Sequence, residues 1–430
     1  MFFIGVGGVW FMAQRWEARL PFFYGWVVFV LTFLIYMFMY GLRYSVGVFF
    51  TPIQQEFGWS TAATASGVTI FFWVYALSAP FVGSLADRIG VRKTVLLGGL
   101  LLGGGGAMVS FVTELWQLYV AWGVVAAMGS AALYVVPTMA LSKFFHRKRG
   151  LTVGWSSVGV SAGQAVIIPV VASFIPALGW RASIRALGLV VMTVTAVIGY
   201  LFLREDPESL GLHPDGLDSP IVDEGDGNPG EVNWMPREAV GTTCFMLTAV
   251  SYFFAVGGII SILTFVVPHM ITIGVPPLQA SAAFGVIGIM SAVGSFVFGV
   301  VSDRYGRKTT ILLTTGGMAV AFLVATVIPA NIALLYAWAV LYGVSYGGAP
   351  EQYAAITTDY FGRRYNTTLF GLMTLAGGLG GGLFPLVGGW LVDLTGSYYA
   401  TLLFLGGMMA LASLTTYLAK PPGAPTRPAP

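Results

Sequence analysis

A few charged and phenolic side chains stand inside long apolar stretches of this sequence, and Arg43 is the first of them. Tyr40, Arg43 and Gly47 follow Tyr36 by four, seven and eleven residues, so all four share one face of a helix. A guanidinium pairs with carboxylates and phenols form hydrogen bonds, so this face could bind an anion. Alternatively, the Arg43 side chain extends to a polar boundary or fixes a neighbouring helix.

Glu351 is the one acid of the second half that stands well inside a predicted helix rather than at its end. It precedes Asp359 by eight residues, which is about 12 Å along a helix. A carboxyl in an apolar interior can bind and release a proton near neutral pH, so Glu351 is a candidate proton carrier. It could instead pair with an ammonium group, or be a structural acid bonded to a neighbouring helix end.

His269 is a second candidate for proton coupling, because imidazole titrates near neutral pH. It follows Phe265 and Ser261 by four and eight residues and therefore shares a helix face with them. Its place near a helix end is equally typical of an interfacial histidine.

Further phenols could line the same site, or serve only in packing: Tyr119, Tyr134, Tyr342 and Tyr346. Tyr346 and Pro350 flank two glycines, and this pattern predicts a bend whose backbone carbonyls face a cavity.

The sequence lacks the motifs of the common catalytic and nucleotide sites. There is no His/Glu metal pair, no nucleophile elbow and no phosphate-cradling GxxxxGK[ST] loop. The single cysteine, Cys244, excludes internal disulfides and cysteine-based clusters. We therefore expect no enzyme activity, no metal, no cofactor, no nucleic-acid partner and no ATP-driven pumping.

The elements that position these residues must lie in lipid. The chain has 430 residues, of which 57% are apolar and only 9% charged. A soluble protein carries about 25% charged residues, and so few charges could not cover a water-exposed surface. The 57 glycines are typical of membrane helices that pack closely.

Twelve apolar runs are long enough to cross a bilayer, which takes about 20 residues. They are 24–50, 61–86, 94–113, 115–140, 150–174, 182–203, 239–270, 279–302, 309–329, 331–357, 367–392 and 398–419. The runs are continuous rather than alternating, which excludes a membrane β-barrel.

The cations assign an orientation to these predicted helices. Of the 21 lysines and arginines, 18 fall in the N-terminal segment, the even-numbered loops and the tail; the others are Arg43, Arg181 and Arg185. Such a bias predicts that both termini are cytoplasmic, in a plasma (inner) membrane protein. Residues 1–23 form the N-terminal segment, and translation could start at Met1 or Met12.

An acidic, Pro- and Gly-rich segment at 204–238 has a net charge of −8 and predicts a solvated cytoplasmic linker. It separates an N-terminal six-helix bundle, 24–203, from a C-terminal one, 239–420, which a tail follows at 421–430. The fold class is thus an all-α membrane protein with twelve transmembrane helices.

The two bundles are copies of one another. A loop motif, Gly-x-x-x-Asp-Arg-x-Gly, occurs at Gly83–Gly90 and again at Gly299–Gly306, 216 residues further on. Phe145 and Phe361 are separated by the same interval, which indicates duplication, as in many secondary transporters. Charged residues of the two loops could form a cytoplasmic gate, or only static ion pairs that follow the topology: Asp87, Arg88, Arg92, Asp303, Arg304 and Arg307.

With this loop motif the chain resembles the major facilitator superfamily. Three stretches resemble the monocarboxylate transporter and oxalate/formate antiporter group within it: 24–50, 144–163 and 384–398. The resemblance implies two pseudo-symmetric bundles with helices 1, 4, 7 and 10 around a central cavity. Many members bind substrate through an arginine in helix 8 and some have a lysine in helix 11. In this chain the position of the helix 8 arginine falls at or near Gly294 and Ser295, and residues 370–378 of helix 11 contain no lysine.

The sequence therefore predicts a secondary transporter that works by alternating access as a monomer. The expected cargo is a small organic acid of the monocarboxylate kind, moved with a proton or by exchange, with Ser295 among the contacts. A neutral or zwitterionic solute, such as an amino acid or an exported amphiphile, is the alternative because two expected cations are missing. A membrane sensor that transports nothing is the third reading.

Overall fold

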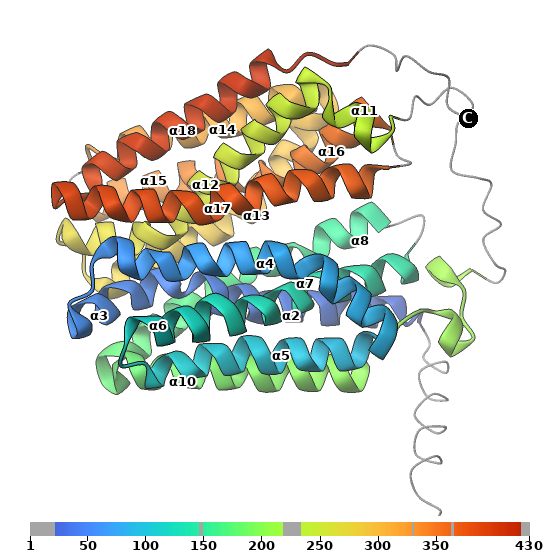
Figure 1. Ribbon diagram of the computed structural model, residues 1–430, viewed down its shortest axis with the longest axis horizontal. Helices are drawn as coiled ribbons and strands as arrows, with labels where there is room; N and C mark the ends of the chain where they lie inside the picture. The colour runs from blue at the N-terminus through green and yellow to red at the C-terminus, as the bar shows by residue number, and fades with distance from the viewer. Residues whose placement is uncertain (1–21, 146–148, 218–233, 329–330, 363–364, 423–430) are drawn as a thin grey trace, which may run out of the picture.

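The computed structural model describes residues 22–145, 149–217, 234–328, 331–362 and 365–422, and within them every regular element is a helix (Figure 1). The first half contains α2 Gly25–Tyr44, α3 Val46–Phe57, α4 Thr61–Ile89, α5 Val91–Met108, η1 Val109–Phe111, α6 Leu115–Leu118, η2 Tyr119–Ala126, α7 Ala127–Phe144, α8 Arg149–Ser156, α9 Val158–Ala162, η3 Gly163–Ile167 and α10 Ile168–Phe202. After η4 Glu208–Leu210 and η5 Pro214–Gly216, the second half contains α11 Pro236–Val240, α12 Thr243–Thr272, α13 Pro277–Tyr305, α14 Arg307–Ala325, α15 Ile332–Gly347, α16 Pro350–Phe361, α17 Asn366–Thr395 and α18 Tyr398–Leu418.

The described residues form twelve membrane-spanning helices, as the sequence predicts. Eleven stretches are long and apolar enough to span a bilayer, and one of them, Gly154–Phe202, has 49 residues. A straight helix of that length would reach about 70 Å, more than twice the hydrocarbon thickness. At Gly179 the backbone has φ 77°, which only glycine adopts readily, and the chain reverses there into a separate helix.

Several spanning helices are interrupted near their middle. The first consists of α2 and α3, with Ser45 between them, and the fourth of α6, η2 and α7. The tenth breaks between Gly347 and Pro350, where α15 ends and α16 begins, at the bend that the sequence predicts. Ser45 and Gly347, which stand at two of these interruptions, are buried, as expected for irregular backbone at membrane depth.

The duplication is visible in how the helix ends are bonded. Arg92 Nε donates to the Leu203 carbonyl at 3.0 Å, at the end of α10. Lys308 Nζ donates to the Ala419 carbonyl at 2.8 Å, at the end of α18. Donors and acceptors are each 216 residues apart, so the same cap closes the sixth helix of both halves.

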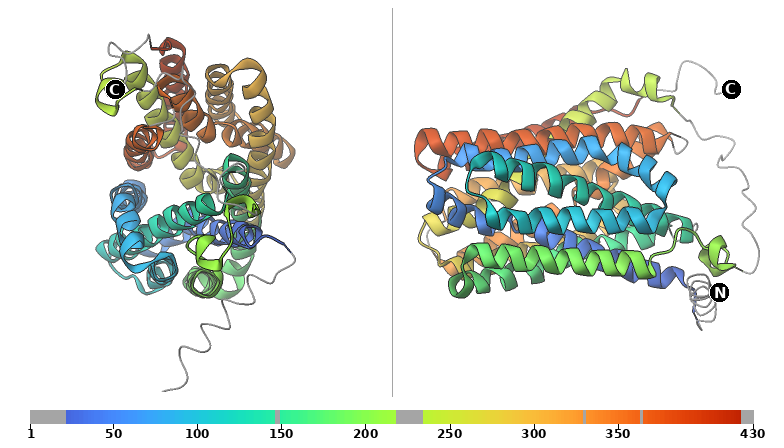
Figure 2. Two further views of the ribbon diagram at one scale, coloured as in Figure 1. Left: turned by 90° about the vertical axis from the view of Figure 1, so that its right-hand side faces the viewer. Right: turned by 60° about the horizontal axis from the view of Figure 1, so that its bottom comes forward.

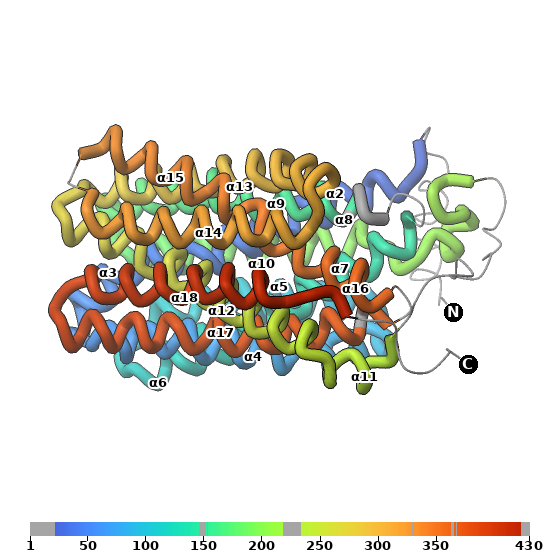
Figure 3. Tube along the Cα trace, turned by 90° about the horizontal axis from the view of Figure 1, so that it is seen from above, coloured from blue at the N-terminus to red at the C-terminus, as the bar shows by residue number. Residues whose placement is uncertain are grey.

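The halves lie against one another along closely packed helices. Seen from the end where the described chain termini lie, they form two groups (Figure 2). Along their length α4 packs on α17, and α9 and η3 pack on α13 (Figure 3). Glycines of α17 permit the first contact: a Cβ at Gly382 would collide with Trp73, and one at Gly389 with the backbone of Ala62.

We call the two ends of the molecule the basic end, which has the loops after Ile89 and Tyr305, and the opposite end, which has Gly58 and Gly396. Several sequence predictions lie wholly or partly outside the described residues. They are the N-terminal segment with Met1 and Met12, residues 218–233 of the linker at 204–238, the basic residues Arg147, Lys148, Arg363 and Arg364, and the end of the tail.

Candidate functional site

Arg43 stands in the last turn of α2, where the first spanning helix is interrupted, and only 6% of its surface is exposed. Its Nε and Nη1 atoms are buried and have no hydrogen-bond partner. No carboxylate among the described residues forms an ion pair with it within 4.0 Å. A buried charge without a counter-ion is costly, and this is the feature expected of a group that awaits an anionic ligand.

Five aromatic rings from two helices surround the Arg43 guanidinium. Phe72 and Tyr75 of α4 lie closest, with ring centroids at 4.5 Å from Cζ. Phe71 and Tyr40 lie at 5.3 Å and Tyr44 at 6.0 Å. Ring faces attract the cation but accept no full N–H hydrogen bonds, so the cage holds the group in place without replacing an anion.

A cluster of phenols continues from this cage to the fourth spanning helix. Tyr36 donates to the Tyr134 carbonyl at 3.2 Å and bonds the Thr138 hydroxyl, and its ring stacks on Tyr134 at 5.7 Å. Tyr40 meets Tyr36 edge-on at 6.3 Å. The face predicted around Arg43 therefore points at α4 and α7 inside the protein.

Glu351 stands in the first turn of α16, directly after the break in the tenth spanning helix, and is exposed. It interacts electrostatically with Tyr134 of the first half and with Tyr252 and Tyr346 of the second. Tyr134 is 39% exposed although it lies midway along its helix. Glu351 therefore lies among phenols of both halves, and both Glu351 and Tyr134 keep exposed surface there.

A small pocket connects Arg43 with the second half. Its lining comes from the first, second and fourth spanning helices and from α12: Arg43, Tyr44, Val46, Val68, Phe71, Phe72, Trp122, Ile260, Leu263 and Thr264. The guanidinium is the charged group of this lining, so an anion that entered here would meet Arg43.

Three of the predicted residues lie apart from this cluster. Tyr119 donates to the Ala63 carbonyl at 2.9 Å and so ties η2 to α4. Ser295 donates to the Gly347 carbonyl at 2.5 Å, where the tenth helix is interrupted. His269 packs edge-on against Tyr398 at 5.8 Å near the opposite end.

Tyr75, Phe71 and Phe72 are site residues that the sequence prediction missed. All three belong to α4, and Tyr75 follows Phe71 by one helical turn. The spacing of this Phe-Phe-x-x-Tyr group is a signal, but nothing in the sequence links it to Arg43 on another helix.

At the basic end, the charged loop residues bond within their own halves. Arg307 pairs with Asp303 at 3.1 Å and with Asp359 at 3.7 Å, and donates to Ser302. Asp87, Arg88 and Arg304 are exposed, and Arg92 holds the end of α10.

At the opposite end, one carboxylate joins the halves. Asp393 of α17 accepts from the backbone N–H of Thr61 at 2.7 Å and from that of Ala62 at 2.8 Å. N–H groups in the first turn of a helix have no acceptor within that helix. Asp393 therefore completes the N-terminal cap of α4 from the other half. The Glu56 carboxylate nearby accepts from Trp180 at 2.6 Å and Arg181 at 2.7 Å.

Comparisons with known proteins agree with this architecture. The family model of the Major Facilitator Superfamily matches residues 29–291 and 246–430. The chain is 26% identical to Monocarboxylate transporter 12 of Xenopus laevis, covering 92% of this chain and 89% of that protein. It is 28% identical to Monocarboxylate transporter 11 of Homo sapiens, with 94% and 84% covered.

Solved structures agree on the fold. A crystal structure of a bacterial homologue of the human lysosomal transporter Spinster, inward-facing and unoccupied, superposes with a TM-score of 0.72 at 18% identity. The match covers 92% of this chain and 97% of that one. The relatives are transporters, not enzymes, and the apolar helices make this chain an integral membrane protein. The chain belongs to the Major Facilitator Superfamily, as a transporter resembling the monocarboxylate transporters.

Proposed function

We propose that the protein transports a small organic acid of the monocarboxylate kind by alternating access, and that Arg43 binds its carboxylate. The observation that carries the proposal is the buried guanidinium whose Nε and Nη1 lack partners. One cation suits a single carboxylate, which can accept hydrogen bonds from two N–H groups of the guanidinium. The names of the relatives favour the same cargo.

Proton coupling through Glu351 is part of this proposal. The Glu351 side chain is exposed, so water could deliver a proton to it, and it stands on the half opposite Arg43. A proton on Glu351 and a carboxylate on Arg43 would enter together and leave together. Exchange of one acid for another is the mode that remains if Glu351 does not titrate during transport.

The proposed topology places both termini, the linker at 204–238 and the loop charges in the cytoplasm. It treats 24–203 and 239–420 as the two moving bodies of a monomer in the plasma membrane. The charges Asp87, Arg88, Arg92, Asp303, Arg304 and Arg307 form a gate that closes when the basic ends approach.

Uptake by purified protein in liposomes tests the carboxylate site. We expect Arg43→Gln to lower kcat/KM for a labelled monocarboxylate about 10- to 100-fold, the value of a lost charge-assisted hydrogen bond. The matched control is Arg185→Gln, which removes an exposed arginine that lies over Phe111 at 5.0 Å. Equal uptake by both variants would refute the site.

A zwitterionic cargo is the second candidate, and the charge arrangement favours it. The duplicate of Arg43 is Ile259 and the duplicate of Glu351 is Val135, so each half contributes one charge of opposite sign. A carboxylate on Arg43 and an ammonium on Glu351 would satisfy both.

Paired solutes separate the two candidates. Competition by an acid and by its 2-amino derivative is measured in wild type and in Glu351→Gln. A zwitterion carrier prefers the amino acid and loses that preference in Glu351→Gln. A proton-coupled acid carrier prefers the plain acid, and the variant loses its response to an imposed proton gradient.

A further inference from the structure

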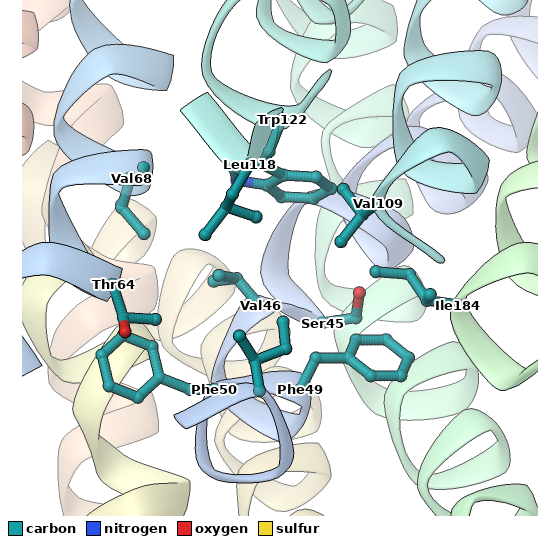
Figure 4. A pocket seen from close by; sticks show the side chains of 12 residues that line it. Ser45, Val46, Phe49, Phe50, Thr64, Val68, Val109, Leu118, Trp122 and Ile184 are labelled. Carbon is teal, nitrogen blue, oxygen red and sulfur yellow. The ribbon is translucent and has the colours of Figure 1, made fainter. Parts of the chain in front are cut away.

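A second pocket adjoins the Arg43 site on the side of the opposite end (Figure 4). It lies inside the first half, and its lining comes from the first, second, third, fourth and sixth spanning helices: Ser45, Val46, Phe49, Phe50, Ile53, Thr64, Gly67, Val68, Val109, Leu118, Trp122 and Ile184. In the close view the side chains of α3, α4 and η2 converge on it, with Ile184 of α10 closing one side.

This pocket continues from the pocket that contains Arg43. Val46, Val68 and Trp122 line both, so the two pockets are adjacent. Arg43 and Phe50 are seven residues apart, and the second pocket therefore extends about 10 Å from the guanidinium along the first helix. A molecule held by Arg43 would reach it with its other end.

The second pocket suits an apolar group and not a polar one. Its two hydroxyls are already used, since Ser45 donates to the Leu42 carbonyl at 2.7 Å and Thr64 to the Ser60 carbonyl at 3.0 Å. The remaining lining is aliphatic or aromatic. The free space is small and fits a short group of about two or three carbons.

We propose that this pocket is the subsite for the non-polar tail of the acid and that it sets the preferred tail length. The inference rests on the proposed function, because Arg43 must hold the carboxylate for the tail to point here. Gly67 is the residue that leaves room for the tail. A Cβ at Gly67 would meet the Leu118 side chain at 3.7 Å, an ordinary contact, so alanine fits without displacing the helices.

The test is calorimetric binding of straight-chain monocarboxylates, from acetate to hexanoate, to purified protein in detergent, with Arg43→Gln as the blank. Each buried methylene is worth about a fourfold lower Kd. We expect this gain from acetate to about butyrate or pentanoate and none beyond. Gly67→Ala should leave the Kd of acetate unchanged, and its Kd values should stop decreasing about one carbon earlier in the series. In Val68→Ala the decrease in Kd should continue to longer chains.

Gly104→Ala is the matched control, because a Cβ there meets nothing within 4 Å and Gly104 lines neither pocket. If acids bind through Arg43 but their Kd values do not depend on chain length, the subsite is wrong and the proposed function stands. The same holds if Gly67→Ala behaves like Gly104→Ala. If no acid binds above the Arg43→Gln blank, the proposed function itself fails.

Discussion

At the scale of single residues, Arg43 is a buried cation that forms no ion pair within the part of the chain that the structure describes. Cation–π contacts are worth about 0.5 to 2 kcal/mol each and do not replace the water lost from Nε and Nη1 of Arg43. The attraction is therefore available to a carboxylate that arrives, which is how a buried cation gains selectivity for acids over neutral analogues.

Stability measurements can detect this cost directly. Replacing a buried unpaired charge by an apolar side chain of similar length should stabilise the protein, by about 1 to 4 kcal/mol in comparable cases. We expect Arg43→Met to raise the thermal unfolding temperature of the ligand-free protein and to abolish stabilisation by acids. Arg181→Met provides the contrast, because Arg181 pairs with Glu56 at 2.7 Å, and its unfolding temperature should fall.

The sequence could predict this site only in part. Tyr36, Tyr40 and Arg43 share one helix, so their common face follows from helical periodicity alone. The rings of Phe72 and Tyr75 reach the guanidinium from another helix, and tertiary packing decides that contact. The family resemblance alone points to Ser295, and in this chain its hydroxyl donates to the Gly347 carbonyl.

At the scale of elements, the cap on α4 joins the two halves at the opposite end. Asp393 supplies from α17 two acceptors that the first turn of α4 lacks, so the halves separate here only if two backbone N–H groups lose their partners. At the basic end the described ion pairs of Arg307 lie within one half, so they would not be broken if the halves separated there.

Weakening this cap should favour opening at the opposite end. A carboxylate at a helix N-terminus is worth about 1 kcal/mol, so Asp393→Asn should raise the open population about fivefold. The measurement is the labelling rate of Phe50→Cys, in a Cys244→Ser background, by an impermeant maleimide added from the outer side. Asp359→Asn, which removes a partner of Arg307 at the basic end, should not raise the rate.

The elements themselves were predictable because each must satisfy its backbone inside lipid, which leaves continuous apolar runs in the sequence. The predicted run 115–140 corresponds to a helix that extends to Phe144, and 239–270 to one that begins at Thr243. The interruption after Tyr44 was not predictable, since Ser45 has helical backbone angles and no proline or glycine precedes it directly.

At the scale of the whole molecule, the proposed alternating access requires the halves to separate at the opposite end in every cycle. The Ala62 backbone N–H donates to the Asp393 carboxylate across the interface, and we expect cysteines at these two positions to form a disulfide. We expect the oxidised Ala62→Cys/Asp393→Cys protein, without Cys244, to lose uptake and to regain it on reduction. Each single variant should be insensitive to oxidant, and uptake that persists after complete cross-linking would contradict alternating access here.

The opposite charges of Arg43 and Glu351 also bear on the response to membrane voltage. With Glu351 ionised and no substrate bound, the charges of Arg43 and Glu351 cancel, so the potential would exert no net force on the return of the unloaded carrier. A bound monocarboxylate adds one negative charge, worth about 2.3 kcal/mol for each 100 mV crossed. A proton on Glu351 would cancel it, so acid moved with a proton is electrically silent, whereas acid moved alone generates a current.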